Sequence, residues 1–173
     1  MQCSRVLVVT GASGVGKTTL VRTLESRGVP GVSFYYFDSI GVPSVEEMTL
    51  KFGSAAKWQL AMTNNWLERL ARADGLAVLD AQVRPSVCRE AFARLHVDGD
   101  IVLIDCEHDV RETRLRDERA QPELITREMA CWASYLRGQA DALELPIIDT
   151  TSLSINAAAD QLHALVSARS ATL

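Results

Sequence analysis

The sequence predicts a doubly wound α/β domain built on a five-stranded parallel sheet. Five short apolar runs alternate with stretches of helical apolar spacing along the 173 residues. Most of the runs are continuously apolar, as expected for parallel strands covered on both faces. The third observation is a glycine-rich loop that joins the first run directly to a helical pattern. The predicted strands are residues 5–10, 33–37, 76–80, 101–105 and 146–149.

Helical patterns fill the intervals between these strands. Ser44 followed by Glu47 forms a capping-box signature, and Gly53-Ser54 divides this part of the chain into two helices. In the second of these helices, apolar residues recur at every fourth position, at Trp58, Met62, Trp66 and Leu70. Further helices are predicted at residues 18–24, 86–96, 109–117, 126–143 and 154–168.

The loop after the first strand matches the phosphate-binding pattern G-x-x-x-x-G-K-[ST] at every fixed position. This P-loop consists of Gly11, Ala12, Ser13, Gly14, Val15, Gly16, Lys17 and Thr18, and Thr19 follows it. Its glycines allow the backbone N–H groups to point at a polyphosphate, and the next helix adds the positive end of its dipole. Lys17 supplies a charge for the β- and γ-phosphates, and the Thr18 hydroxyl is a ligand for Mg²⁺. The alternative is a chance glycine-rich turn, but the strand–loop–helix frame favours a nucleoside triphosphate site.

Composition and charge restrict the partners. Hydrophobic residues make up 47% of the chain and charged residues 23%, which is ordinary for a globular protein. The formal net charge of −4 argues against a nucleic-acid surface, which needs a basic footprint. With no apolar run of membrane-spanning length and no signal-peptide pattern, we expect a single cytoplasmic domain over residues 1–173 and no membrane partner. We expect reduced thiols, with no zinc site, at Cys3, Cys88, Cys106 and Cys131.

Two acids follow predicted strands at the edge of the sheet where ligands bind in such folds. Asp80 closes the apolar run 76–79 and has the form of an acid that holds a Mg²⁺-bound water. Asp38 ends the second strand, where its carboxylate would point into the cleft opposite the triphosphate. For both acids the alternative is a structural one, in which the side chain caps the following turn.

The chain resembles the P-loop kinases of small metabolites and nucleoside monophosphates, a group that includes shikimate, gluconate and adenylate kinases. The resemblance rests on the P-loop, Asp38, the segment 80–85, the arginines between 111 and 119, and the tail 147–150. It covers nearly the whole chain in element order. It implies the strand order 2-3-1-4-5, MgATP as the phosphoryl donor, and a small acceptor molecule that carries a hydroxyl or a phosphate.

The resemblance also implies roles for individual side chains. Asp38 would orient or deprotonate the hydroxyl of the acceptor molecule. Arg84 would clamp an anionic group of that molecule, although Ala81 stands where adenylate kinases have glycine and Pro85 follows the arginine. A solvated surface arginine is the alternative for Arg84. Asp149 and Thr150 would lie beside the nucleotide base.

A lid is the last feature that the resemblance implies, over about residues 116–127. Arg116 and Arg119 would close over the transferred phosphoryl group, whereas Arg111 is expected to be solvated. The Gln121-Pro122 pair predicts the end of the preceding helix. The alternative for the arginines is an exposed helix face with i,i+4 ion pairs. The family would also allow Trp58, Met62 and Trp66 to line the acceptor pocket, whereas their spacing favours a core stripe.

Three classes of function are compatible with these residues. The first is an ATP-dependent phosphotransferase that acts on a small molecule. The second is a P-loop regulatory ATPase or switch that has no small-molecule acceptor, and the third is a protein that binds ATP without turnover. Asp38 favours the phosphotransferase, because a switch has no need of an acid on the acceptor side.

Overall fold

Five parallel strands form the centre of the protein, for which a computed structural model describes residues 5–170. The strands are β1 (Arg5–Thr10), β2 (Val32–Tyr36), β3 (Leu76–Asp80), β4 (Asp98–Asp105) and β5 (Ile147–Asp149). Their order in the sheet is β2-β3-β1-β4-β5, and every neighbouring pair is parallel. The predicted fold class and strand order are therefore confirmed. The largest difference is at β4, which begins at Asp98 rather than at Ile101.

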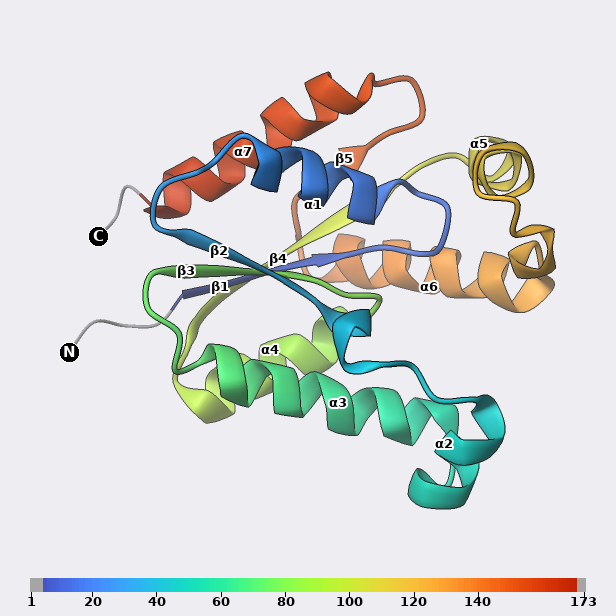
Figure 1. The fold of residues 1–173 in the computed structure, drawn as a ribbon, viewed down its shortest axis with the longest axis horizontal. Coiled ribbons are helices and arrows are strands. Elements are labelled where there is room, and N and C mark those ends of the chain that lie inside the picture. The colour runs from blue at the N-terminus through green and yellow to red at the C-terminus, as the bar shows by residue number, and fades with distance from the viewer. Residues whose placement is uncertain (1–4, 171–173) are drawn as a thin grey trace.

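Helices cover both faces of the sheet (Figure 1). One face carries α1 (Lys17–Ser26) and α7 (Ile155–Ser170), which pack against each other. The other face carries α3 (Ala55–Leu70), α4 (Pro85–Leu95) and α6 (Arg127–Ala142). Two shorter helices, α2 (Val45–Phe52) and α5 (His108–Thr113), lie beyond the sheet on the side of its carboxyl ends. None of the helices between residues 5 and 170 has the length and apolarity needed to cross a bilayer.

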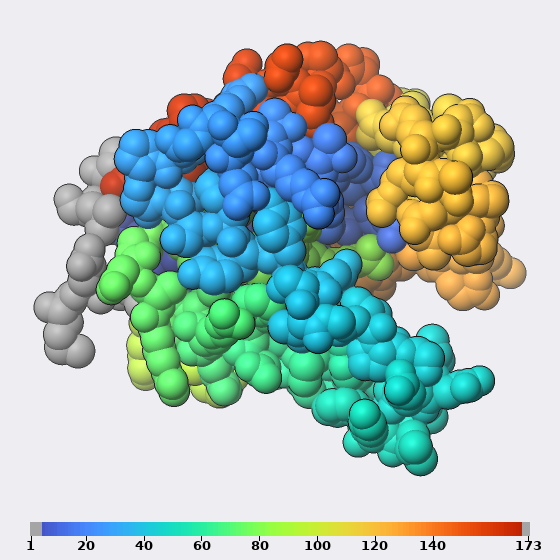
Figure 2. All heavy atoms as spheres, viewed as in Figure 1, coloured from blue at the N-terminus to red at the C-terminus, as the bar shows by residue number. Residues whose placement is uncertain are grey.

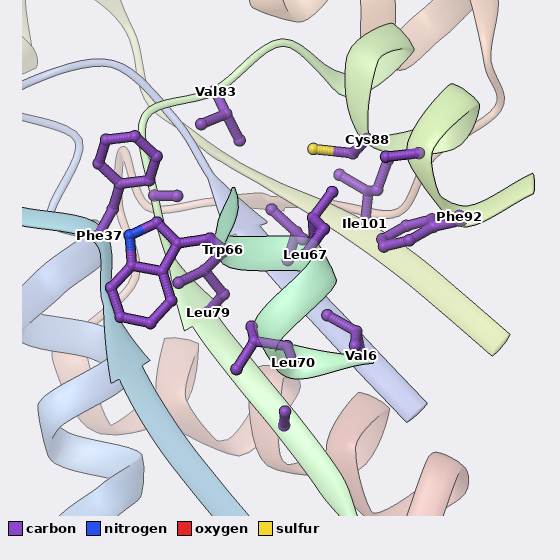
Figure 3. Close-up of a cluster of buried hydrophobic side chains, with 14 of the residues drawn as sticks. Val6, Phe37, Trp66, Leu67, Leu70, Leu79, Val83, Cys88, Phe92 and Ile101 are labelled. Atoms are coloured by element: carbon purple, nitrogen blue, oxygen red, sulfur yellow. The ribbon is translucent and has the colours of Figure 1, made fainter. Parts of the chain in front are cut away.

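The stripe of large apolar residues on α3 belongs to the core. Trp58, Trp66 and Leu70 are buried in one cluster with β1, β3, β4 and α4, and Met62 packs against its edge. Figure 3 shows side chains of this cluster gathered between α3, α4 and the strands. The spacing argument for a core stripe is therefore confirmed.

Local sequence signals determine where α2 begins and ends and where α3 begins. The Ser44 hydroxyl accepts a hydrogen bond from the Glu47 N–H at 3.2 Å, and the Glu47 carboxylate accepts one from the Ser44 N–H at 3.0 Å. This is the predicted capping box. Gly53 then ends α2 with a φ of 87°, and Ser54 caps α3. The break predicted at Gly53-Ser54 is confirmed.

The segment after β4 departs from the prediction of one helix over residues 109–117. Helix α5 ends at Thr113, and the chain continues as a π-helical turn, η2 (Arg114–Glu118). A hydrogen bond from the Arg119 N–H to the Arg114 carbonyl closes this turn. A short turn, η3 (Pro122–Leu124), precedes α6. The side chain of Leu115 is fully buried in this turn. The extra residue in the turn changes the directions of the side chains that follow, and such π-helical turns are frequent at functional sites.

Candidate active site

The P-loop leaves the carboxyl end of β1 and wraps around the start of α1. Gly16 precedes α1 with a φ of 89° and Gly14 has a φ of 88°, a left-handed conformation that favours glycine. A Cβ atom at Gly14 would lie only 2.8 Å from Leu115 Cγ. The loop is therefore held in a glycine-dependent curve by the segment after β4, and a curve of this kind presents N–H groups to an anion.

A cleft of about 610 Å³ opens beside the P-loop. Figure 2 shows the hollow between the start of α1, the segment that leads into α2, and the segment around α5 and η2. The P-loop side of the cleft is lined by Ala12, Ser13, Gly14, Gly16, Lys17, Thr18 and Thr19. The other walls are lined by Arg22, Tyr36, Phe37, Asp38, Ser39, Asp80, Ala81, Gln82, Arg114, Glu118 and Arg119. Of the predicted P-loop residues, Gly11 and Val15 are buried behind this surface.

Lys17 and Asp80 form an ion pair at the base of the cleft. Asp80 ends β3 and is 5% exposed, and Thr18 lines the same cleft beside Lys17. A carboxylate and a hydroxyl are hard oxygen ligands of the kind that Mg²⁺ takes, in numbers of one or two, together with phosphates and water. These two side chains therefore fit a magnesium site that a bound polyphosphate completes. Between residues 5 and 170 no cluster of three or more His, Cys, Asp and Glu side chains is arranged to hold a metal by itself.

Asp38 lies opposite the P-loop, but not at the end of a strand as predicted. Strand β2 ends at Tyr36, and the chain turns through η1 (Phe37–Ile40) because Phe37 is drawn into the core, edge-on to Trp58 at 5.9 Å. The Asp38 carboxylate is exposed, lines the cleft and has no hydrogen-bond or ion-pair partner within residues 5–170. Only its backbone carbonyl serves the turn, by accepting a hydrogen bond from the Gly41 N–H at 3.0 Å. The carboxylate is therefore free for chemistry in the cleft.

Arg114 is a cleft residue that the sequence reasoning missed. Its guanidinium donates to the Thr150 carbonyl at 2.7 Å, and lies 2.9 Å from Thr150 Oγ1 and 3.3 Å from the Val15 carbonyl. The Thr150 hydroxyl in turn donates to the Val15 carbonyl at 2.8 Å. One arginine thus joins η2, the P-loop and the loop after β5. A signal was present: Arg111, Arg114 and Leu115 fall on one helix face, so the apolar residue marks that face as the inner one.

The other arginines of this segment are placed differently from one another. Arg111 is only 2% exposed, its stem packs on Gly14 and its guanidinium lies 3.1 Å from His108 Nδ1, so the expectation of a solvated side chain was wrong. Because Gly14 has no side chain, the long side chain of Arg111 fits between α5 and the P-loop. Arg119 lines the cleft, and Arg116 is exposed outside the lining.

Three further predicted residues, Arg84, Asp149 and Thr150, lie away from the lining of the cleft. The Arg84 guanidinium donates to Gln59 Oε1 at 2.8 Å and stacks on the Trp132 ring at 5.1 Å. The Asp149 carboxylate accepts hydrogen bonds from Thr151, including one from its N–H at 2.8 Å, and these bonds hold the pKa of Asp149 below its usual value. Thr150 is buried beneath Arg114.

Comparison with known proteins finds similarity in structure rather than in sequence. No protein-family model matches the chain, and no curated protein matches it significantly. Among solved structures, the shikimate kinase from Acinetobacter baumannii in complex with shikimate is similar with a TM-score of 0.64 and 18% identity, over 96% of this chain and 94% of that one. The tunicamycin resistance protein of Deinococcus radiodurans has a TM-score of 0.63 and 21% identity, over 94% and 95% of the two chains.

A third similar structure is the APS kinase from Mycobacterium tuberculosis in complex with AMPPNP and APS. It has a TM-score of 0.59 and 16% identity, over 96% of this chain and 99% of that one. The molecule therefore has the fold of the P-loop kinases that act on small molecules, as the resemblance implied. No particular member of that group is singled out by these similarities.

Proposed function

We propose that this protein is an ATP-dependent phosphotransferase that moves the γ-phosphoryl group of MgATP to a hydroxyl of a small molecule. The observation that carries this proposal is the Asp38 carboxylate, which is unpartnered among the described residues and lines the same cleft as the P-loop. A binding module or a switch has no need of an acid there, whereas transfer to an alcohol needs a base within reach of the hydroxyl. The kinase fold shared with the solved neighbours supports the proposal.

In the proposed reaction the oxygen of the acceptor molecule attacks the γ-phosphorus as the bond to the bridging oxygen of ADP breaks. Asp38 takes the proton of the attacking hydroxyl, and the bridging electron pair leaves with ADP. Lys17 exchanges its ion pair with Asp80 for the phosphates, and Arg119 faces the cleft to neutralise charge that develops on the transferring group. Mg²⁺, held by Thr18 and through water by Asp80, would supply further neutralising charge.

The acid on the acceptor side gives the test. Asp38→Asn should leave MgATP affinity unchanged but lower phosphoryl transfer about 10²–10⁴-fold, because an amide can orient a hydroxyl but cannot take its proton. The assay follows ADP release across a panel of hydroxyl-bearing metabolites. Asp74→Asn is the matched control, because Asp74 is an exposed acid in the turn before β3 and does not line the cleft.

The regulatory ATPase predicts a different result. ATP turnover would then be as fast without an acceptor as with every compound tested, and Asp38→Asn would leave it unchanged. Absence of MgATP binding by the wild-type protein would contradict both functions. Binding is measured by thermal shift, since a ligand that binds only the native state raises its stability.

A further inference from the structure

Gln82 lies where the carboxyl end of β3, the P-loop and α3 meet. It follows Asp80 by two positions, at the carboxyl end of β3, and its side chain lines the cleft. The side-chain Oε1 accepts a hydrogen bond from the Ser13 hydroxyl of the P-loop at 3.1 Å. The backbone carbonyl of Gln82 accepts one from Gln59 Nε2 on α3 at 2.8 Å. Both the main chain and the side chain of this residue are therefore held.

The contact with Ser13 determines which atom of the amide is free. A glutamine amide offers an acceptor at Oε1 and two N–H donors at Nε2. Oε1 is engaged by Ser13, whereas Nε2 has no hydrogen-bond partner among residues 5–170. Nε2 is also accessible, because the buried side-chain atoms without a partner in that range do not include it. Nε2 is therefore open to the cleft that Gln82 lines. Because both atoms are bonded to one carbon, this donor also lies close to the P-loop.

Gln59 fixes the backbone of Gln82 from outside the cleft. Its amide is used at both ends, since Nε2 donates to the Gln82 carbonyl and Oε1 accepts from Arg84 Nη1 at 2.8 Å. The Arg84 guanidinium is held in turn against the Trp132 ring of α6. A chain of contacts therefore runs from α6 and α3 to the P-loop, and it ends at the free amide nitrogen of Gln82.

The position of this donor points to the last phosphate of the nucleotide. On the β4 side of β1, Arg114 and Thr150 contact the Val15 carbonyl of the P-loop. Gln82 lies on the opposite side, beside Asp80 and in the cleft that Asp38 also lines. In an in-line transfer the γ-phosphate lies between the nucleotide and the acceptor molecule. The N–H group of Gln82 is thus on the side of the loop where charge develops.

We propose that Gln82 Nε2 donates a hydrogen bond to an oxygen of the γ-phosphate, and that Gln59 is a positioning residue for that donor. This inference rests on the proposed binding of a nucleoside triphosphate, but not on the identity of the acceptor molecule. A bond to the γ-phosphate is present with a triphosphate and absent with a diphosphate. The difference in affinity between the two nucleotides therefore isolates the contact.

The first measurement is calorimetric titration with MgAMPPNP and with MgADP. Gln82→Leu keeps the approximate size of the side chain but removes the donor together with the acceptor of the Ser13 hydroxyl. Gln82→Glu keeps an acceptor for Ser13 and places a carboxylate oxygen where the donor was. Since hydrogen bonds to charged groups are the strong ones, Gln82→Leu should weaken MgAMPPNP binding about tenfold and Gln82→Glu more, with MgADP changed less than about twofold. Retained MgADP affinity also shows that the variants are folded.

The second measurement tests the positioning role. Gln59→Leu should weaken MgAMPPNP binding about threefold and leave MgADP unaffected, because the donor is less well held rather than lost. Asn64→Leu is the matched control: it lies on the same helix, and its amide contacts the Leu60 carbonyl and Arg94 rather than Gln82. It should change neither affinity.

Two results would overturn the inference. One is an equal loss of affinity for both nucleotides in the Gln82 variants, which would indicate a disturbed P-loop rather than a lost contact. The other is unchanged affinity for both. If the wild-type protein bound neither nucleotide, the proposed function itself would be contradicted. That outcome is distinguishable from the two results above, because it is measured on the wild-type protein alone.

Discussion

The ammonium group of Lys17 is paired with the Asp80 carboxylate, and the two side chains are only 12% and 5% exposed. The pair brings a P-loop residue and the last residue of β3 together at the base of the cleft. A nucleotide that uses Lys17 must therefore replace this interaction, and Asp80 must gain water or a cation in return. Removing either partner alone leaves a charge in a poorly solvated site.

The first prediction separates the stability of this pair from its binding role. Lys17→Met should lower the free energy of unfolding by about 1–3 kcal/mol, because the buried carboxylate loses its partner. The double variant Lys17→Met/Asp80→Asn should regain most of that stability. Neither variant should show a thermal shift with millimolar MgATP. Urea denaturation and thermal shift measure the two effects, and full MgATP affinity in Lys17→Met would contradict the role of the lysine.

The second prediction concerns Gly14. Alanine there would adopt a φ of 88° and place Cβ 2.8 Å from Leu115 Cγ and 3.0 Å from Arg111 Cγ. Gly14→Ala should therefore cost about 1–2 kcal/mol for the left-handed backbone and a further 1–3 kcal/mol for overpacking. Gly28→Ala is the control, with a φ of 67° and no neighbour within 4 Å, and should cost only the backbone part. Equal losses of unfolding free energy in the two variants would contradict this prediction, because they would show that Leu115 and Arg111 make room for the Cβ atom at no cost.

Most of the architecture could be predicted because its signals are local. The continuous apolar runs identified β1 and β3 at their observed bounds, and the Ser44 and Glu47 pair identified the start of α2. Asp38 lines the cleft, but the strand before it ends at Tyr36, one residue earlier than the sequence predicts. The cause is Phe37, whose burial against Trp58 turns the chain out of the sheet and is a contact between distant residues.

The arginines after β4 show where sequence reasoning stops. Four of them occur between residues 111 and 119, and position along the chain favours Arg116 and Arg119 for the lid because they lie nearest the break at Pro122. The π-helical turn beginning at Arg114 changes the directions of these side chains, and it depends on how Leu115 and Arg111 pack against Gly14. Arg111 is consequently buried and Arg114 reaches Thr150. Spacing puts Arg111 and Arg114 on the face of Leu115, but the π-helical turn itself depends on contacts with the distant Gly14.

The third prediction tests Arg114 as a link between the P-loop and the loop after β5. Arg114→Met and Thr150→Val should each destabilise the protein. Because the two residues share the same hydrogen bonds, the double variant should fall short of the sum by about 0.5–3 kcal/mol. The control is Arg27→Met, which removes an exposed ion pair with Asp160 and should cost at most about 1 kcal/mol. Strict additivity in the denaturant cycle would contradict a shared network.

The last prediction distinguishes the two arginines expected in the lid. Arg119 lines the cleft, whereas Arg116 is exposed outside its lining, although both lie within the segment 116–127. A guanidinium that meets the transferring phosphoryl group matters more in the transition state than in the bound substrate, so its loss lowers kcat rather than raising KM. Arg119→Ala should therefore lower kcat about 10²–10³-fold with little change in KM for ATP.

Arg116→Ala serves as the matched control and should keep kcat within about twofold, since an exposed charge away from the cleft is screened by solvent. The readout is steady-state ADP release with an acceptor molecule found in the metabolite panel. If both variants kept full kcat, these arginines would be surface charges of the turn, and among the side chains assigned to the site the neutralising charge at the γ-phosphate would have to come from Lys17.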